Sequence, residues 1–155
     1  MLYIICGLQG TGKTTVAKKL SERINGILLR TDAIRKEIID KPTHSEEEKR
    51  RVYEEMLLRA RQLIEKGKDV ILDATFSKRV YRDEAKKISK GKYIIIETVC
   101  PEEIAKERLE TRDEIGANYK THLKCKKNFE PVEEEHVIID TSKDIDRQLE
   151  KFVFN

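Results

Sequence analysis

Residues 7–15 read Gly7-Leu8-Gln9-Gly10-Thr11-Gly12-Lys13-Thr14-Thr15. The first eight of them fit the pattern G-x-x-x-x-G-K-[ST], which is typical of a P-loop. Glycines let the backbone pass close to phosphate groups and turn its N–H groups toward them. We expect Lys13 to reach the β- and γ-phosphates of a nucleotide, and the Thr14 hydroxyl to hold Mg²⁺. The residues predicted to bind Mg·ATP are Gly7, Gly10, Thr11, Gly12, Lys13, Thr14 and Thr15.

The residues on either side of this loop support the same interpretation. The apolar run Leu2–Cys6 precedes the loop, and Val16, Ala17, Leu20 and Ile24 follow it at helical spacing. A helix that begins at the loop adds the partial positive charge of its N-terminus to a phosphate site. Because a chance glycine-rich turn would lack this strand, loop and helix, we interpret the motif as functional.

Short apolar runs alternate with amphipathic stretches along the rest of the chain. The runs are rich in β-branched residues and do not alternate with polar ones, which is typical of strands buried on both faces. They are Leu2–Cys6, Ile27–Leu29, Val70–Leu72, Tyr93–Ile96 and Val137–Ile139. Strands separated by helices predict β-α-β crossovers. The expected fold is therefore α/β, with a mainly parallel five-stranded sheet and helices on both of its faces.

Helix boundaries are also marked in the sequence. Ser45 followed by Glu48 predicts a capping box, and Gly67 is expected to end the helix that begins there. Pro101 suits the first turn of a helix over residues Glu102–Thr111. Ser142 is expected to cap the last helix.

The bulk composition favours a single soluble domain over residues 1–155. The chain is 38% hydrophobic and 39% charged, with a net charge of +3. A dedicated nucleic-acid binder usually carries a clustered basic face, so nucleic acid is not the favoured partner. The three cysteines are widely spaced and predict neither a disulfide framework nor a zinc site. No leader peptide or membrane-length apolar run is present, and we expect a cytoplasmic protein.

Two aspartates follow predicted strands, at the edge of the sheet where ligands of open α/β folds bind. Asp73 ends the run Val70–Leu72, and in that position it would hold the Mg²⁺ shell together with Thr14. Asp32 follows the run Ile27–Leu29 and could accept a proton from an acceptor hydroxyl. The alternative for each aspartate is structural: a turn or helix cap at Asp73, and an N-cap at Asp32.

The order of these motifs resembles the small P-loop kinases. These are relatives of the polynucleotide kinase domain, of chloramphenicol phosphotransferases and, more distantly, of gluconate kinases. The resemblance covers nearly the whole chain and rests on the P-loop and on two further segments, Thr31-Asp32-Ala33-Ile34-Arg35-Lys36 and Leu72-Asp73-Ala74-Thr75-Phe76. It implies the strand order 2-3-1-4-5, Asp32 as the general base and Arg35 as a residue that holds the substrate. Since strands lie about 4.8 Å apart, this order places Asp73 nearer the metal and Asp32 on the acceptor side.

Arg108 and Arg112 lie four residues apart, on one face of the predicted helix after Pro101. The family has a similar R-x-x-x-R at the start of its lid. The resemblance implies that both arginines contact the donor phosphates and that Arg112 neutralises charge in the transition state. The lid is expected over about residues 111–129. The alternative is that these are surface arginines paired with neighbouring glutamates such as Glu110.

Three functions remain open at this point. The leading one is an ATP-dependent kinase that moves the γ-phosphate of Mg·ATP to a hydroxyl of a small molecule or nucleotide, whose identity the sequence does not reveal. The second is a 5′-hydroxyl polynucleotide kinase, whose basic tunnel would be built from Arg30, Arg35, Lys36, Lys41, Lys78, Arg79 and Arg82. The third is an ATP-binding switch without kinase activity.

Other classes of P-loop protein are disfavoured. A GTPase needs an N-K-x-D motif, which is absent, and no predicted strand precedes the D-x-x-G match at residues 113–116. The segments and lengths that ABC and AAA-type ATPases need are also missing. His44, His122 and His136 are scattered and are assigned no role.

Overall fold

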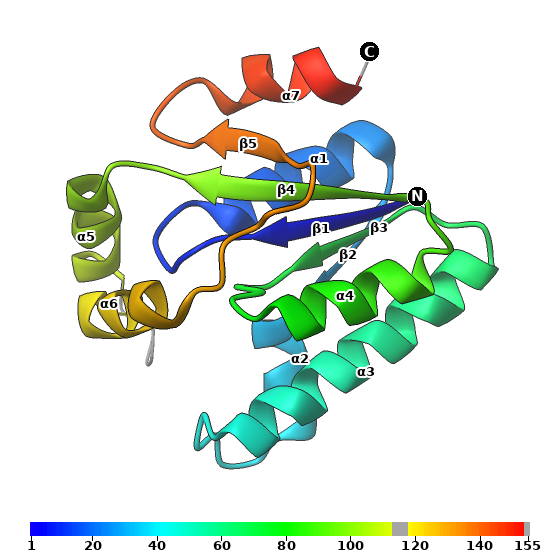
Figure 1. Cartoon of the computed structure of the whole chain (residues 1–155), viewed down its shortest axis with the longest axis horizontal. Coiled ribbons are helices and arrows are strands. Elements are labelled where there is room, and N and C mark those ends of the chain that lie inside the picture. Colours follow the sequence, from blue (N-terminus) through cyan, green and yellow to red (C-terminus); the bar gives the residue numbers. More distant parts are fainter. Residues whose placement is uncertain (113–117, 154–155) are drawn as a thin grey trace.

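Five parallel strands form the centre of the molecule (Figure 1). The computed structural model describes residues 1–112 and 118–153. Its strands are β1 (Leu2–Cys6), β2 (Ile27–Arg30), β3 (Val70–Asp73), β4 (Tyr93–Val99) and β5 (Val137–Asp140). Their order in the sheet is β2-β3-β1-β4-β5. Both the α/β class with five parallel strands and the order 2-3-1-4-5 are therefore confirmed.

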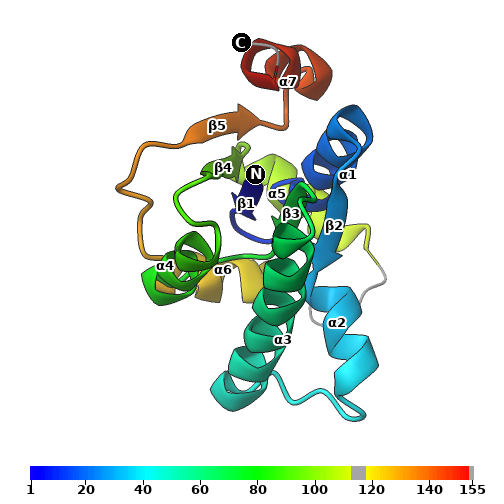
Figure 2. The same ribbon diagram turned by 90° about the vertical axis from the view of Figure 1, so that its right-hand side faces the viewer.

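Helices cover both faces of this sheet (Figure 2). They are α1 (Lys13–Ile24), α2 (Thr31–Ile38), α3 (Glu46–Glu65), α4 (Arg79–Ile88), α5 (Glu102–Glu110), α6 (Tyr119–Asn128) and α7 (Ile145–Val153). On one face, Ile5 of β1 packs in a core with residues of α1 and α7. On the other face, Ile4 packs in a second core with residues of α3 and α4. Because successive residues of a strand point to opposite faces, burial on both sides explains the unbroken apolar run in β1.

The predicted helix boundaries are mostly confirmed, with one correction. The Ser45 side chain accepts a hydrogen bond of 3.2 Å from the backbone N–H of Glu48 at the start of α3. Ser142 does not cap α7: its hydroxyl donates to Asp140, at the end of β5. The side chain of Asp144 instead accepts from the backbone N–H of Arg147. The helix begins at Ile145, three residues after Ser142, so Ser142 lies too early in the chain to cap it.

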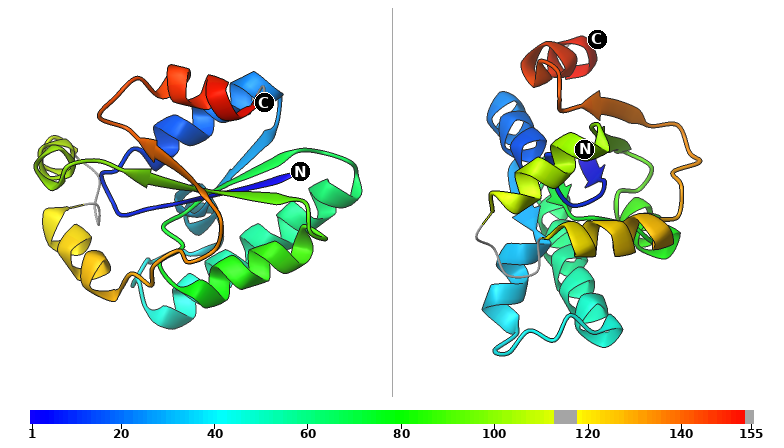
Figure 3. Two further views of the ribbon diagram at one scale, coloured as in Figure 1. Left: turned by 45° about the horizontal axis from the view of Figure 1, so that its top comes forward. Right: turned by 90° about the vertical axis from the view of Figure 1, so that its left-hand side faces the viewer.

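The helices α5 and α6 lie at the carboxyl end of the sheet, beyond the tips of the strands (Figure 3, left). The segment predicted to be the lid, about residues 111–129, begins directly after α5 and contains α6. Residues 113–117 of that segment, including the D-x-x-G match, lie outside the described residues. Among the helices that the structure describes, none combines the length and apolar character needed to cross a bilayer.

Candidate active site

The P-loop connects β1 to α1 and depends on its glycines. Gly12 has a φ of 86° and stands at the N-terminus of α1. Gly10 has a φ of 81°, and a Cβ added there would lie 2.8 Å from the carbonyl oxygen of Ala105. L-residues with a side chain rarely adopt such φ values. The loop conformation and the close approach of α5 therefore both require glycine at these positions.

Lys13 lies at the start of α1, among the charged groups predicted to form the site. Its ammonium group donates a 2.9 Å hydrogen bond to the carbonyl oxygen of Leu8 within the loop. Burial lowers the pKa of Lys13, while the nearby carboxylates of Asp73 and Asp32 oppose that shift and the Arg112 guanidinium adds to it. The carboxylates and the guanidinium therefore act in opposite directions on the pKa of Lys13.

Thr14 and Asp73 come together as the sequence predicted. The Thr14 hydroxyl donates a 2.7 Å hydrogen bond to Oδ2 of Asp73, at the end of β3. The Asp73 side chain is only 5% exposed. A hydroxyl and a carboxylate are oxygen ligands of the kind Mg²⁺ prefers, so the pair fits a metal site beside the P-loop. Asp73 also accepts a hydrogen bond of 3.2 Å from Nε of Arg30, which sequence reasoning did not place here.

Asp32 lies in the first turn of α2, on the β2 side of the P-loop. Arg30 occupies the N-cap position of α2, so Asp32 is not the residue that caps this helix. Its carboxylate is 66% exposed and pairs with Arg35 at 3.3 Å. Asp32 is therefore open to a substrate, and Arg35, which is only 14% exposed, holds the orientation of its carboxylate.

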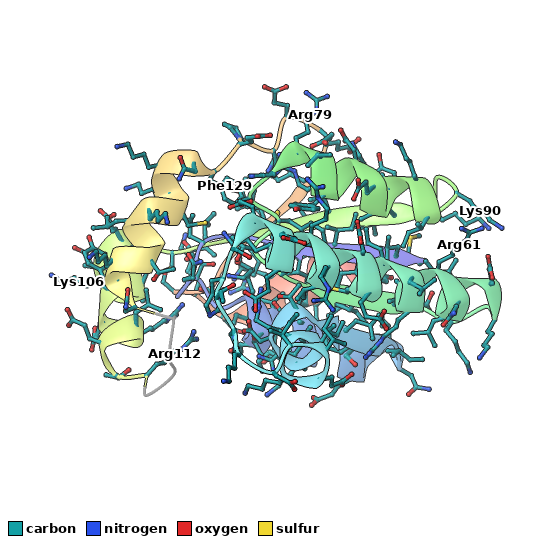
Figure 4. The ribbon with its side chains drawn as sticks, turned by 90° about the horizontal axis from the view of Figure 1, so that it is seen from below. Arg61, Arg79, Lys90, Lys106, Arg112 and Phe129 are labelled. Carbon is teal, nitrogen blue, oxygen red and sulfur yellow. The ribbon has the colours of Figure 1, made fainter. Side chains whose placement is uncertain are left out.

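The two arginines of the predicted lid occupy different positions. The Arg108 guanidinium donates to the carbonyl oxygen of Gly10 at 3.2 Å and to the Thr141 hydroxyl at 2.8 Å, so it joins α5 to the P-loop. Figure 4 shows Arg112 where the chain leaves α5, on the side nearest the body of the molecule. Its side chain is exposed, as a residue that meets a ligand needs to be. The contact of either arginine with donor phosphates remains a prediction.

Thr11 and Thr15, which were also predicted to contact the nucleotide, differ in their environment. Thr15 is exposed, whereas Thr11 is buried. The Thr11 hydroxyl bonds to the carbonyl oxygen of Leu8 at 2.6 Å and to the hydroxyl of Thr98 at 2.8 Å. Its backbone N–H also donates to Leu8, within the loop. A direct contact between Thr11 and a nucleotide therefore stays a prediction and would require this loop to rearrange.

A cavity of about 410 Å³ is lined in part by the P-loop residues Gly7, Leu8 and Thr11. Gly7, Thr98 and Cys100 line its inner wall, and His122, Phe129 and Val132 line the side formed by α6 and the chain after it. Lys13, Thr14, Asp32 and Asp73 are not among the described residues that line it. The cavity is thus separate from the charged groups of the candidate active site.

Sequence reasoning missed the role of His122. His122 lies on α6 and its side chain is buried. Its Nδ1 lies 2.7 Å from the carbonyl oxygen of Gln9 in the P-loop. This contact anchors α6 to the loop. Gln9 and His122 are 113 residues apart, and no pattern near either of them indicates the contact.

Arg82 was one of the seven candidates for the basic tunnel of the polynucleotide kinase alternative, and the structure does not place it on a surface. The side chain is fully buried in α4. Its guanidinium donates to the backbone carbonyl oxygens of Phe76, Glu130 and Pro131 at 2.6–3.1 Å. Arg82 is therefore a structural residue that holds the chain after α6 against the chain after β3. Lys78 and Arg79, two other tunnel candidates, pair with Glu46 and Glu133 respectively.

Comparison with known proteins agrees with this geometry. Residues 2–132 match the family AAA_33, described as an AAA domain. Over 112 residues the chain is 29% identical to an uncharacterised protein of Mycobacterium tuberculosis and to another of Mycobacterium bovis. This region covers 64% of the chain but only 22% of the length of each relative.

Three solved structures share the fold. A sugar kinase from Janibacter sp. HTCC2649 superposes with a TM-score of 0.80 at 17% identity, covering 99% of this chain and 92% of that one. A gluconokinase from Sinorhizobium meliloti 1021 gives 0.74 at 17% identity, covering 96% and 87%. The APS kinase CysC of Mycobacterium tuberculosis, solved with AMPPNP and APS, gives 0.75 at 15% identity, covering 99% and 95%.

Identities this low establish a common fold and leave the substrate open. The family assignment has a separate basis, because the match at residues 2–132 spans most of the chain, including the P-loop, Asp32, Asp73 and both lid arginines. This protein belongs to the AAA_33 family, which is described as an AAA domain.

Proposed function

We propose that the protein is an ATP-dependent kinase that transfers the γ-phosphate of Mg·ATP to a hydroxyl of a small molecule or nucleotide. The observation that carries the proposal is the 2.7 Å hydrogen bond between the Thr14 hydroxyl and Asp73. It joins the P-loop to an acidic strand end, beside a lysine on which the charges of Asp32 and Arg112 also act. The proposal takes the P-loop as the donor site and Asp32 as the base on the acceptor side.

In this mechanism the P-loop N–H groups and Lys13 bind the β- and γ-phosphates. Thr14 and Asp73 would hold Mg²⁺, which would neutralise phosphate charge. Asp32 accepts the proton of the acceptor hydroxyl. The hydroxyl oxygen forms a bond to the γ-phosphorus, and the bond from that phosphorus to the β–γ bridging oxygen breaks, so that ADP leaves. Arg35 orients Asp32, and Arg112 neutralises charge as the phosphoryl group moves.

The two alternatives are less well supported. A polynucleotide kinase needs a basic tunnel, and of its seven candidate residues Arg82 is buried, while Lys78 and Arg79 are paired with glutamates. A switch without kinase activity does not require a general base, so it does not explain the exposed carboxylate of Asp32 beside Arg35. The pair formed by Asp32 and Arg35 therefore favours transfer to an acceptor.

A panel of acceptors tests the proposal. ADP formation is measured with Mg·ATP alone, with hydroxylated small molecules, with nucleosides and with an oligonucleotide carrying a 5′-hydroxyl. We expect at least one small hydroxyl compound or nucleoside to raise the rate and to appear as its phosphate ester. Stimulation by the oligonucleotide alone would support the polynucleotide alternative. Slow hydrolysis that ignores every acceptor would support the switch.

A matched pair of lysine variants completes this test. Lys13→Met removes the ammonium group from the P-loop, and acceptor phosphorylation should fall to background. Lys18→Met makes the same change at an exposed position of α1 and should leave the rate unchanged. Parental activity in Lys13→Met would contradict the assignment of the P-loop as the phosphate site.

A further inference from the structure

Arg30 contacts both residues of the candidate metal site. Its Nε donates to Oδ2 of Asp73 at 3.2 Å, and its Nη2 donates to the Thr14 hydroxyl at 3.3 Å. Thr14 in turn donates to the same Oδ2 at 2.7 Å. The three side chains thus form a closed set of hydrogen bonds around one carboxylate oxygen.

The fold places Arg30 in this position. Arg30 is the last residue of β2 and stands directly opposite Asp73 in the register between β2 and β3. Residues at matching positions on neighbouring strands project to the same face of a sheet, which explains why both side chains reach Thr14 on α1. The Arg30 side chain is 31% exposed, whereas Asp73 is 5% exposed. The arginine can therefore move toward solvent, while the carboxylate stays in place.

The charges of these groups have a direct consequence for metal binding. A carboxylate of low exposure needs a cation beside it, because an unpaired buried charge is costly. Arg30 supplies that cation, and with the guanidinium in place the pair with Asp73 is neutral. A divalent cation arriving at Thr14 then meets a neighbouring positive charge instead of a free carboxylate. Lys13 adds a second positive charge close to Asp73, so the site does not become strongly acidic when Arg30 moves away.

We propose that Arg30 is the resident cation of the Thr14–Asp73 pair and sets the concentration of Mg²⁺ that nucleotide binding requires. The inference rests on the proposed function, because it takes Mg·ATP as the ligand of the P-loop. Mg²⁺ at Thr14 competes with the Arg30 guanidinium for the hydroxyl oxygen and for the charge of Asp73. Removal of Arg30 therefore frees both oxygen ligands.

The test measures binding and does not depend on turnover. The affinity for a non-hydrolysable ATP analogue is determined by calorimetry over a series of Mg²⁺ concentrations, for the parent protein and for Arg30→Met. We expect the Mg²⁺ concentration at half-maximal binding to fall by roughly tenfold or more, because one unit charge beside a divalent cation is removed. In EDTA without nucleotide, Arg30→Met should melt several degrees below the parent, since Asp73 has lost its partner.

Three further variants separate charge from structure. Arg30→Gln is neutral but still able to donate a hydrogen bond to Asp73, and it should show the same fall in the Mg²⁺ requirement even if Arg30→Met folds poorly. Arg30→Lys keeps the charge and should stay close to the parent. Arg23→Met removes an arginine of similar exposure, which pairs with Asp146 on the α1–α7 face, and should leave the requirement unchanged.

Two outcomes overturn the inference alone. One is an unchanged Mg²⁺ requirement in both neutral variants, and the other is an increased requirement, which would mean that Arg30 helps to assemble the metal site. If the parent protein binds no nucleotide at any Mg²⁺ concentration, the proposed function fails and the inference fails with it. The parent titration therefore distinguishes the two failures.

Discussion

At the scale of single residues, the surroundings of Asp32 bear on its proposed role as a general base. It lies within the first turn of α2 but does not cap that helix, and its carboxylate is 66% exposed with Arg35 as its partner. Exposed ion pairs contribute little to stability. A carboxylate that contributes little to the fold, yet is held in orientation on the acceptor side, suits a general base.

Asp32→Asn should separate catalysis from folding. We expect acceptor phosphorylation to fall by roughly 10²-fold, at the low end of the effect of a general base because the transition state of phosphoryl transfer is loose. The melting temperature should be nearly unchanged and ATP affinity should stay within a few-fold of the parent. Asp40→Asn, an identical change at an exposed position just after α2, serves as the control in rate, melting and binding measurements. Parental turnover in Asp32→Asn would show that another group accepts the proton.

At the scale of elements, a single buried arginine joins α4 to the chain that follows α6. Arg82 lies in α4, and its guanidinium binds the carbonyl oxygens of Phe76, Glu130 and Pro131. It also lies 5.8 Å from the ring centre of Phe129. Figure 4 shows Phe129 where the chain leaves α6, on the side that faces α4. The position of α6 and of the chain after it thus depends on this arginine as well as on His122.

Arg82→Met should therefore affect stability far more than a change at a surface arginine of the same helix. We expect the free energy of unfolding to fall by about 3 kcal/mol or more, because three carbonyl oxygens lose a charged donor in a buried setting. Arg79→Met, at a position 57% exposed, should change it by less than about 0.5 kcal/mol. Urea denaturation of both variants provides the comparison. Equal and small changes, together with weaker oligonucleotide binding by Arg82→Met, would instead support a tunnel role for Arg82.

At the scale of the whole molecule, the P-loop is connected to most of the sheet. Gly7 donates its backbone N–H to Thr75 after β3, Thr11 bonds to Thr98 of β4, and Arg108 of α5 binds Gly10. Unfolding of the sheet would therefore destroy the phosphate site. Any ligand that binds only the folded loop stabilises the entire domain.

A non-hydrolysable ATP analogue with Mg²⁺ should consequently raise the melting temperature. At about 100 times its Kd the gain is about 2.7 kcal/mol, which corresponds to roughly 5–11 °C for a chain of this size. The shift is followed by scanning calorimetry, with the Kd taken from a separate titration at 25 °C. Lys18→Met should keep the shift and Lys13→Met should lose it. Saturated binding without any shift would indicate that the P-loop unfolds before the sheet.

The class of the fold and the P-loop could both be predicted from the sequence alone. Strands buried on both faces leave continuous β-branched runs, and a P-loop is encoded in nine consecutive residues, so both can be recognised without knowledge of the packing. The pairing of Thr14 with Asp73 followed from the rule that strand carboxyl ends meet at one edge of the sheet. The order of the strands came from the resemblance to small P-loop kinases, because the apolar runs alone do not say which strands are neighbours.

Contacts between side chains that are far apart in the sequence became clear from the packing of the elements. Arg30 reaches Asp73 across 43 residues of sequence, and His122 reaches Gln9 across 113. Nothing in the sequence around Arg82 indicates that it is buried. Its burial follows from the packing of α4 against the chain after α6. Local patterns report which face of an element is buried, whereas a contact between two elements depends on their register and on the side-chain conformations that packing selects. For that reason the ligands of the candidate metal site could be predicted from the sequence, and the arginine that lies on them could not.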